Sequence, residues 1–500
     1  MLPLLTAAQI READAFTIAN EPVSSIELME RASKAFVNWF INHFPDKKKS
    51  ISVYCGTGNN GGDGLAIARL LDQHGYEQIG VKLVQFSDKE SPDFRENLQR
   101  LKALNIPAKS IGQGETAVAE TSEILIDALL GSGLNKPLTG DYQALVNYLN
   151  TLNKMVVAVD VPTGFYTDGE VEQDATVLKA DLVITFQQPK INFLLPESGP
   201  FINCWEAVNI GLNEEFIRSM QSPYEWVEEK DIKAILKPRT RFSHKGTFGH
   251  ALLIAGQAKT MGAALLCSSA CMYAGAGLTT ACIPESGLTA LNSYQAEVMA
   301  IVRQAYEMPE LELDKYSTVA IGPGLGKDDD ALALLQYVLD EYEHPIVVDA
   351  DALNLLAVHP RLLASLPAGS ILTPHMKEFD RLFGEHTGWW QRLQTLQQKA
   401  QELNICIVLK NAYTMVGCPN GKVYFNSTSN AAMAVGGMGD VLTGIITALL
   451  AQKYTPEQAC IAGVYLHGKA GDELALPNRL QVVLPGQVAA RIPATIAKLL

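Results

Sequence analysis

The sequence predicts two α/β domains, each built around a mainly parallel β-sheet. The chain has 500 residues, about three times the usual length of one domain. In both halves, short apolar runs alternate with amphipathic segments, as in repeated strand–helix–strand units. The alternation stops over residues 222–247, which are polar, contain two prolines and show no evident strand. We therefore expect domains at residues 1–224 and 225–500.

The expected elements follow from apolar spacing and from helix signals. Two helices open the chain, and the second begins at Ser24, where Glu27 completes a capping box. Further helices are expected after Gly439, Pro456 and Pro485. The expected strands are residues 51–54, 81–86, 124–126, 155–159 and 182–186 in the first half, and 251–254, 318–321, 346–348 and 406–409 in the second.

Charge and cysteine usage exclude several classes of protein. The formal net charge of -14 argues against binding nucleic acid through its phosphate backbone. The eight cysteines include no CxxC pair, and several lie in apolar runs, so we expect buried free thiols in a reducing compartment. The N-terminus lacks the features of a secretion signal, and residues 441–451 are too few to cross a bilayer. We expect a cytoplasmic protein with no membrane partner.

A glycine-rich loop follows the first expected strand. Residues 56–64 read Gly-Thr-Gly-Asn-Asn-Gly-Gly-Asp-Gly and lead into a helix. Glycines let backbone N–H groups approach a ligand, and a helix N-terminus favours phosphate. The loop lacks the Gly-Lys-Ser/Thr ending of a Walker loop, but Asn59, Asn60 and Asp63 add side chains that a plain turn does not need.

Two further strands of the first half end in a carboxylate. Asp127 precedes Gly131-Ser132-Gly133-Leu134, and Asp160 precedes Val161-Pro162-Thr163-Gly164. Ligands of open α/β sheets lie outside the carboxyl ends of the strands. We therefore expect Asn60, Asp127, Asp160 and Thr163 to converge on one site. The alternative is that each aspartate only caps the turn or helix that follows it.

These motifs, together with Ile26-Glu27-Leu28-Met29-Glu30-Arg31, resemble the YjeF N-terminal family of NAD(P)HX epimerases over about residues 1–220. The resemblance implies a Rossmann-like three-layer domain that interconverts R and S hydrates of NADH and NADPH at C6 of the nicotinamide ring. It implies K⁺ held by Asn60, Asp127 and Thr163, and Asp160 as the catalytic acid or base. The residues that it implies contact the hydrate are Asn59, Asn60, Gly61, Gly62, Asp63, Gly131, Ser132, Gly133, Leu134, Asn135, Lys136, Pro137 and Asp160.

The second half has a comparable glycine-rich turn before a helix. Gly436-Gly437-Met438-Gly439 precedes Asp440, so stacked N–H groups and one carboxylate face the same place. The alternative is a simple helix-capping aspartate. Polar segments also follow the expected strands, at residues 322–326, 349–354, 373–378 and 410–414.

These segments resemble the ribokinase-like YjeF C-terminal family, the ADP-dependent NAD(P)HX dehydratases, from about Lys245 to the C-terminus. The resemblance implies a ribokinase-like α/β domain in which Asp440 is the catalytic base and Mg²⁺ and ADP are cofactors. It implies Gly324, His375 and Asp440 as hydrate-binding residues. The residues that it implies bind ADP or AMP are Lys410, Asn411, Ala412, Tyr413, Thr414 and Gly439.

The chain departs from the family pattern at a few places. Met376-Lys377 replaces a usual Pro-Gly, and Asn411 and Ser429 each replace a usual Gly. If a glycine at position 411 allows close approach of the nucleotide, Asn411 weakens that approach.

The expected function is a bifunctional repair enzyme. Its substrates would be NADHX, NADPHX and ADP, it would release AMP and phosphate, and we expect a homo-oligomer. One alternative is a ribokinase-like small-molecule kinase fused to a nucleotide-binding domain. Another is a non-enzymatic RNA–protein scaffold, against which Asn60, Asp127 and Asp160 argue.

Overall fold

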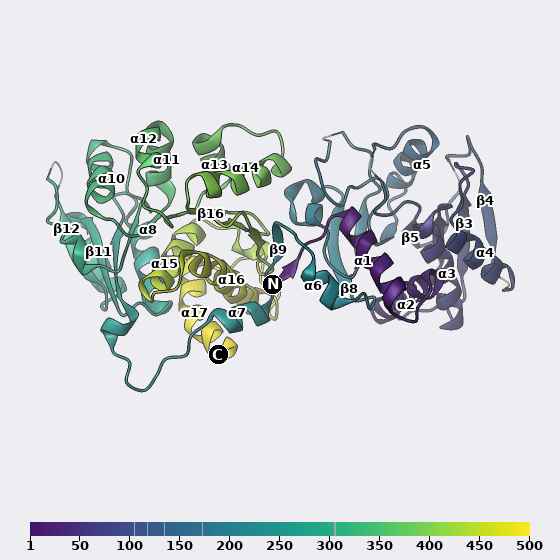
Figure 1. Ribbon diagram of the computed structural model, residues 1–500, viewed down its shortest axis with the longest axis horizontal. Coiled ribbons are helices and arrows are strands. Elements are labelled where there is room, and N and C mark those ends of the chain that lie inside the picture. Colours follow the sequence, from purple (N-terminus) through teal and green to yellow (C-terminus); the bar gives the residue numbers. More distant parts are fainter. Residues whose placement is uncertain (105, 118, 135, 173, 305–306) are drawn as a thin grey trace. The chain divides into compact units, whose positions relative to one another are not determined.

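The computed structural model describes residues 1–500 except 105, 118, 135, 173 and 305–306. The chain forms two compact units (Figure 1). The first unit contains Pro3–Ser222 and Gly388–Trp390. The second unit contains Met1–Leu2, Pro223–Thr387 and Gln391–Leu500. Among the described residues, no helix is both long and apolar enough to cross a membrane.

The first unit contains a seven-stranded sheet in which neighbouring strands are parallel. The strand order is β4-β3-β2-β5-β6-β7-β8. The strands are β2 (Ile51–Cys55), β3 (Ile79–Val84), β4 (Ala108–Ile111), β5 (Ile124–Ala128), β6 (Met155–Val159), β7 (Ala180–Phe186) and β8 (Ile202–Val208). Because β2, β5 and β6 are adjacent and parallel, their carboxyl ends meet at one edge of the sheet.

Both faces of this sheet are covered by helices. The helices are α1 (Ala7–Asn20), α2 (Ser25–His43), α3 (Asn59–Gln73), α4 (Pro92–Lys102), α5 (Gly140–Asn150) and α6 (Glu214–Ser219), with the 3₁₀ turns η1 (Ile191–Leu194) and η2 (Pro196–Ser198). On one face, Val53 packs with Phe36 of α2 and Leu65 of α3. On the other face, Tyr54 packs with Leu145 of α5. This alternation along β2 produces the expected three layers.

The second unit contains an eleven-stranded sheet with the order β1-β9-β18-β17-β16-β15-β14-β13-β10-β11-β12. The strands from β16 through β12 are parallel, whereas β17 is antiparallel to both β16 and β18. The strands are β1 (Leu2–Pro3), β9 (Tyr224–Trp226), β10 (His250–Ile254), β11 (Leu278–Pro284), β12 (Met299–Arg303), β13 (Thr318–Ile321), β14 (Ile346–Val348), β15 (Ile371–Leu372), β16 (Cys406–Leu409), β17 (Met415–Gly417) and β18 (Val423–Phe425).

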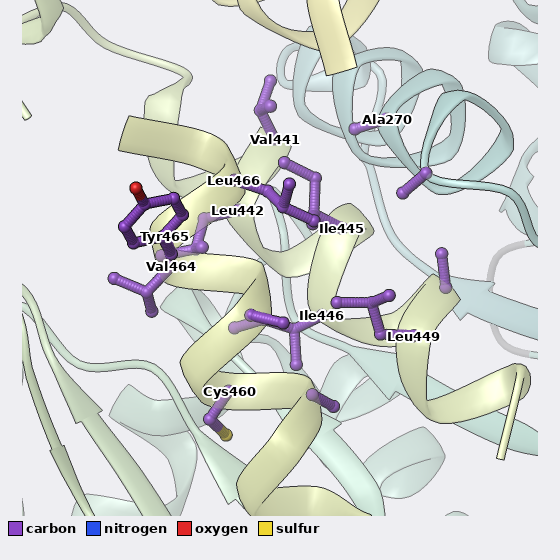
Figure 2. Packing of buried hydrophobic residues seen from close by; sticks show 14 of the residues in the cluster. Ala270, Val441, Leu442, Ile445, Ile446, Leu449, Cys460, Val464, Tyr465 and Leu466 are labelled. Atoms are coloured by element: carbon purple, nitrogen blue, oxygen red, sulfur yellow. The ribbon is translucent and has the colours of Figure 1, made fainter. Parts of the chain in front are cut away.

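The second unit is built around α15 (Met438–Ala451), which is apolar on nearly every side and is therefore buried. Figure 2 shows its side chains Val441, Ile445 and Leu449 packed among residues of α8 (Met261–Tyr273) and α16 (Pro456–Ala475). Each such side chain contributes about 1.5–3 kcal/mol when fully buried. This packing fixes the N-terminus of α15, where Asp440 lies.

The remaining helices of the second unit surround this core. They are α7 (Glu229–Ile235), α9 (Leu288–Tyr294), α10 (Asp329–Glu341), α11 (Ala350–Val358), α12 (Pro360–Ala364), α13 (Met376–Phe383), α14 (Trp389–Glu402) and α17 (Pro485–Leu499), with the 3₁₀ turns η3 (Lys245–Phe248), η4 (Glu285–Gly287), η5 (Leu313–Lys315) and η6 (Ala431–Met433). The three expected C-terminal helices are α15, α16 and α17, so their prediction is confirmed.

Some sequence expectations were wrong in detail. The polar segment 222–247 does contain a strand, β9, which has only three residues and is too short to show a period. The strand expected at 81–86 lies at Ile79–Val84. All eight cysteines are free and seven are buried, but Cys204 is exposed because β8 is the edge strand.

Candidate functional sites

The first unit has a cavity of about 460 Å³ at the carboxyl edge of its sheet. It lies where the loops after β2, β5, β6 and β7 meet, as expected for an open parallel sheet. Its lining includes Ile10, Arg11, Asp14, Gly58, Asn59, Asn60, Asp63, Leu129, Leu130, Gly131, Ser132, Gly133, Leu134, Asp160, Phe186, Gln187, Lys190, Ile210 and Leu212.

At two glycines of the loop, an added side chain would clash with a backbone carbonyl oxygen. A Cβ on Gly56 would lie 2.0 Å from the carbonyl oxygen of Leu129, and a Cβ on Gly61 would lie 1.8 Å from that of Gly56. Gly58 is the N-cap of α3, so the helix begins at Asn59 and directs its first N–H groups toward the cavity edge. These glycines bring the N-terminus of α3 to the strand ends, where an anionic ligand is favoured.

Asp127 and Thr163 lie together beneath the cavity wall. The Asp127 carboxylate accepts hydrogen bonds from the Thr163 hydroxyl at 2.7 Å, the Thr163 N–H at 2.8 Å and the Leu129 N–H at 3.2 Å. Burial nevertheless raises the pKa of Asp127 to about 6, because these three donors only partly offset desolvation. The side-chain amide nitrogen of Asn60 is also buried and has no partner among the described residues.

Asp160 is held in a strained backbone conformation, with φ at 63°. Its Oδ1 accepts from the Lys190 ammonium at 2.9 Å, the Phe186 N–H at 3.0 Å and the Thr185 hydroxyl at 3.1 Å. Its Oδ2 takes no hydrogen bond from the described residues. Asp160 therefore has one anchored oxygen, and the residue lines the cavity.

Only some of the other expected contact residues line the cavity. Asn59, Asn60, Asp63 and the run Gly131–Leu134 line the cavity, whereas Gly61 and Gly62 are buried in α3. Lys136 and Pro137 are exposed and are not among the lining residues. Asn135 lies outside the described residues.

Three charged lining residues, Arg11, Asp14 and Lys190, are absent from the set predicted from sequence. Lys190 lies shortly after β7 and its side chain is only 1% exposed. The sequence shows the lysine but not that it is buried. Asp14 on α1 is more than a hundred residues from Asp160 along the chain, yet both line the same cavity. Burial, together with the nearby Asp160 charge, raises the pKa of Asp14 to about 6.

The second unit has a cavity of about 580 Å³ beside the N-terminus of α15. It is lined by the whole expected nucleotide-binding set, namely Lys410, Asn411, Ala412, Tyr413, Thr414 and Gly439. The loop 410–414 joins the antiparallel strands β16 and β17. The Thr414 hydroxyl donates to the Asn411 carbonyl at 3.0 Å and closes the loop.

Asp349 links this cavity to Asp440. Its carboxylate accepts from the Lys410 ammonium at 3.0 Å and from the Thr443 hydroxyl of α15 at 2.7 Å. Burial raises the pKa of Asp440 to about 7, and the Asp349 charge adds to the shift while Lys410 opposes it. A group with this pKa exchanges a proton near neutrality, as a general base should.

Gly324 and His375 lie on the loops that follow β13 and β15, two strands of the same sheet with β14 between them. Gly324 has φ at 59°, and its carbonyl accepts from the Thr260 hydroxyl at 2.7 Å. His375 caps α13, and its Nδ1 accepts from the N–H groups of Lys377 and Glu378 at 3.1 and 3.3 Å. Helix α13 is therefore still capped by His375 and begins at Met376, although Met376-Lys377 replaces the usual Pro-Gly. Neither residue lines the 580 Å³ cavity.

Two buried side chains in the second cavity have polar atoms without partners among the described residues. They are His467 on α16, through Nε2, and Asn411, through both amide atoms. Burial and the nearby Lys410 charge lower the pKa of His467 to about 4, so its ring is neutral at physiological pH. Sequence reasoning missed His467 because it lies mid-helix, away from any strand end.

Comparison with known proteins matches both units. Residues 25–192 match the family model of the YjeF-related protein N-terminus, and residues 251–494 match that of NAD(P)H-hydrate dehydratase. The bifunctional NAD(P)H-hydrate repair enzyme of Moorella thermoacetica is 33% identical over 99% of this chain and 97% of its own length. The enzyme of the same name from Coxiella burnetii is 35% identical over 95% of each chain. A ribokinase-like superfamily protein of Enterococcus faecalis superposes with a TM-score of 0.51 at 28% identity, covering 56% of this chain and 98% of that chain.

Proposed function

The chain belongs to the family of bifunctional NAD(P)H-hydrate repair enzymes, and from this premise we propose how its two cavities divide the reaction. The first unit epimerises the R and S hydrates of NADH and NADPH. The second unit dehydrates the S hydrate with ADP and restores NAD(P)H. The two activities belong together, because the epimerase supplies the isomer that the dehydratase consumes. A kinase or an RNA–protein scaffold would not account for curated relatives that match both halves.

In the first unit, Asp160 is the proposed acid or base at the reacting carbon. One oxygen is anchored by Lys190, Thr185 and the Phe186 N–H, which leaves the other for the substrate. Asn59, Asn60, Gly61, Gly62, Asp63 and residues 131–137 are proposed to form the surrounding hydrate-binding loops. The α3 N-terminus suits the dinucleotide phosphates, which explains binding by a protein of net negative charge.

We propose that K⁺ is held by Asn60, Asp127 and Thr163, and the residues present fit such an ion. Asp127 is a buried carboxylate to which no cationic side chain of the described residues is bonded, and the Thr163 hydroxyl lies 2.7 Å from Asp127 Oδ1. A Cβ on Gly131 would lie 3.2 Å from the Asn60 side-chain oxygen, so this oxygen is adjacent to the same loop. Neutral and anionic oxygens suit a hard cation, which would offset the Asp127 charge and fix the loop.

In the second unit, Lys410–Thr414 and Gly439 are proposed to bind ADP. Asp440 takes the proton of the C6 hydroxyl as its oxygen attacks the terminal phosphorus of ADP and AMP leaves. Inorganic phosphate then departs from C6 as C5 loses a proton, which restores the ring double bond. Gly324 and His375 are proposed to hold the hydrate on the adjoining loops.

Mg²⁺ is proposed to accompany ADP. The Asp349 carboxylate is already bonded to Lys410 and Thr443, so the protein offers few free ligands. This suits Mg²⁺, which keeps several waters and binds mainly through phosphates. The ion would neutralise charge on the transferring phosphoryl group.

The observation that carries the assignment is the occurrence of two separate cavities on a single chain, one in each unit. Asp160 lines the first cavity, and the second lies beside the N-terminus of α15, where Asp440 is found. The test is to incubate the full chain with each purified hydrate, with and without ADP. We expect R/S interconversion without nucleotide, and NADH absorbance only with the nucleotide. Repeating the assay with ATP in place of ADP shows which nucleotide donates the phosphoryl group. A chain that restores NADH without any nucleotide would contradict the assignment.

We further propose a homo-oligomer in the cytoplasm. The seven buried free thiols suit a reducing compartment, where the NAD(P)H pool is also found. Light scattering of the purified chain measures the oligomeric state, and fractionation of cells measures the compartment.

A further inference from the structure

Asp14 is an uncommitted acid that lines the epimerase cavity. It makes no hydrogen bond or ion pair with the described residues, whereas Asp160 is anchored by Lys190. Asp14 also lies before residue 25, outside the region that the family model matches. Its helix places Ile10, Arg11 and Asp14 on one face, and all three line the cavity.

Helix α1 is fixed firmly enough to hold a reacting group. Its N-terminus has a capping box at Thr6, and its Ala7 N–H donates to Asp168 at 2.8 Å. Near its other end, the Thr17 hydroxyl accepts from the Asn213 N–H at 3.0 Å. The Phe16 ring stacks on Phe216 with centroids 4.0 Å apart. A side chain on this helix is therefore held in place against the sheet edge.

The charged groups around Asp14 favour a proton that can move. Asp160 and Asp63 lie near enough to interact with it electrostatically, Lys190 opposes them, and Arg11 lines the same cavity from the same helix. Burial and the Asp160 charge outweigh Lys190 and raise the pKa of Asp14 to about 6. At this pKa both protonation states are accessible near neutrality. Burial, together with the nearby charges of Asp160 and Asp14, raises the pKa of Asp63 well above its ordinary value.

We propose that Asp14 is a second catalytic residue of the epimerase, paired with Asp160. This inference rests on the proposed epimerase function of the first unit. The hydrated carbon C6 carries a hydroxyl group and the ring nitrogen, so its configuration is lost when the C6–N bond opens. Asp160 accepts the hydroxyl proton as the C=O bond forms, and Asp14 delivers its proton to the nitrogen as the C6–N bond breaks. After rotation about C5–C6, both protons return and the ring closes on the other face.

This reaction needs an acid and a base at the same time, and it consumes no other reagent. Two carboxyl groups that share one cavity, one anchored to a cation and the other unpaired, provide that combination. A single carboxylate would have to accept the hydroxyl proton before it could deliver a proton to the nitrogen, so the two transfers could not occur together.

The test compares Asp14→Asn with the wild type in the full chain, using purified R hydrate and subtracting the uncatalysed rate. We expect kcat for epimerisation to fall on the order of a hundredfold or more, with KM little changed. The wild-type rate should fall as pH rises above about 6, and this alkaline fall should be absent from the variant. The control is Glu12→Gln, which removes an exposed carboxylate from the same helix.

The melting transition of the first unit, measured by calorimetry, reports whether that unit of the variant is folded, and the ADP-dependent conversion of S hydrate reports the same for the second unit. A second variant, Asp14→Ala, should recover rate in proportion to added formate, which a merely structural role would not produce. A raised KM with unchanged kcat, or an unaltered pH profile, would overturn the role of Asp14. If the wild type itself does not epimerise, the proposed function fails instead, so the two failures are distinguishable.

Discussion

The ammonium of Lys190 lies 2.9 Å from Oδ1 of Asp160, and the lysine side chain is only 1% exposed. The same ammonium donates to the Phe186 carbonyl at 3.1 Å. A buried cation is costly unless it is paired and hydrogen-bonded, so this arrangement positions Asp160 more than it stabilises the fold. The strained φ of 63° at Asp160 agrees with a position retained for chemistry.

Lys190→Met should therefore impair the epimerase more than the dehydratase. Removing one partner of a buried ion pair costs about 3–5 kcal/mol, because the other charge is left uncompensated. We expect the first unit to melt at a lower temperature and R/S conversion to fall sharply, with S-hydrate dehydration preserved. Calorimetry and the two separate assays measure this. The exposed Lys179→Met is the matched control, and equal epimerase rates in both variants would contradict the positioning role.

The sequence predicted the parts of the fold that carry a clear period. Residues 51–54, 124–126 and 155–159 were recognised as strands because buried parallel strands are continuous apolar runs. The short strand β9 was not recognised, since three residues show no pattern, and the strand before Thr373 was expected without bounds because β15 has only two residues. Their positions are fixed by pairing with β18 and β14, which are distant along the chain.

The candidate sites were predicted to a similar extent. Asn60 and Asp160 were identified because glycine-rich or polar loops follow strands. Lys190 was missed because it lies just before the 3₁₀ turn η1, and Asp14 and His467 were missed because they lie within helices; only the tertiary fold brings these residues to a cavity. Burial, which distinguishes Lys190 from a surface lysine, is also a tertiary property.

The two units should act independently. We expect a fragment of residues 3–222 to epimerise alone and a fragment of residues 223–500 to dehydrate only the S hydrate, since each forms its own sheet and core. Circular dichroism and the two assays measure this. Fragments that are insoluble while the full chain is active would show that the boundary near residue 225 is wrong.

Asp127→Asn should weaken the response of epimerisation to K⁺. The variant keeps the size of the side chain but removes the charge that offsets a cation, so the K⁺ concentration for half-maximal rate should rise about tenfold. The measurement is the R/S conversion rate against KCl at constant ionic strength, with Asp72→Asn on the exposed side of α3 as the control. Dehydration should not change. A loss of both activities would instead assign Asp127 to folding.

His467→Phe should weaken ADP binding without affecting epimerisation. The ring nitrogen Nε2 is buried without a partner in the nucleotide cavity, and one hydrogen bond contributes about 1 kcal/mol, or roughly fivefold in Kd. Because the pKa of His467 is about 4, wild-type ADP affinity should not change through histidine titration between pH 6 and 8. Calorimetric titration measures both effects, and the exposed His344→Phe is the control. Unchanged affinity in His467→Phe would leave His467 as a packing residue.

Asp440→Asn should abolish most ADP-dependent dehydration and stabilise the protein at high pH. As the base, Asp440 must be ionised, so the wild-type rate should rise with pH through about 7. Its folded-state pKa lies above the unfolded value, so the folded protein binds more protons between about pH 4 and 7 and loses stability as pH rises across that range. Asparagine carries no charge, so the variant does not lose stability in this way as pH rises.

The melting temperature of Asp440→Asn should therefore exceed that of the wild type at pH 8, and the difference should shrink toward pH 4. NADH recovery from the S hydrate should fall on the order of a hundredfold or more, because general-base catalysis is lost. ADP affinity and R/S conversion should persist, since Lys410–Thr414 and the first unit are untouched. A variant of normal turnover and unchanged melting would leave Asp440 as a residue of the first turn of α15 with no part in proton transfer.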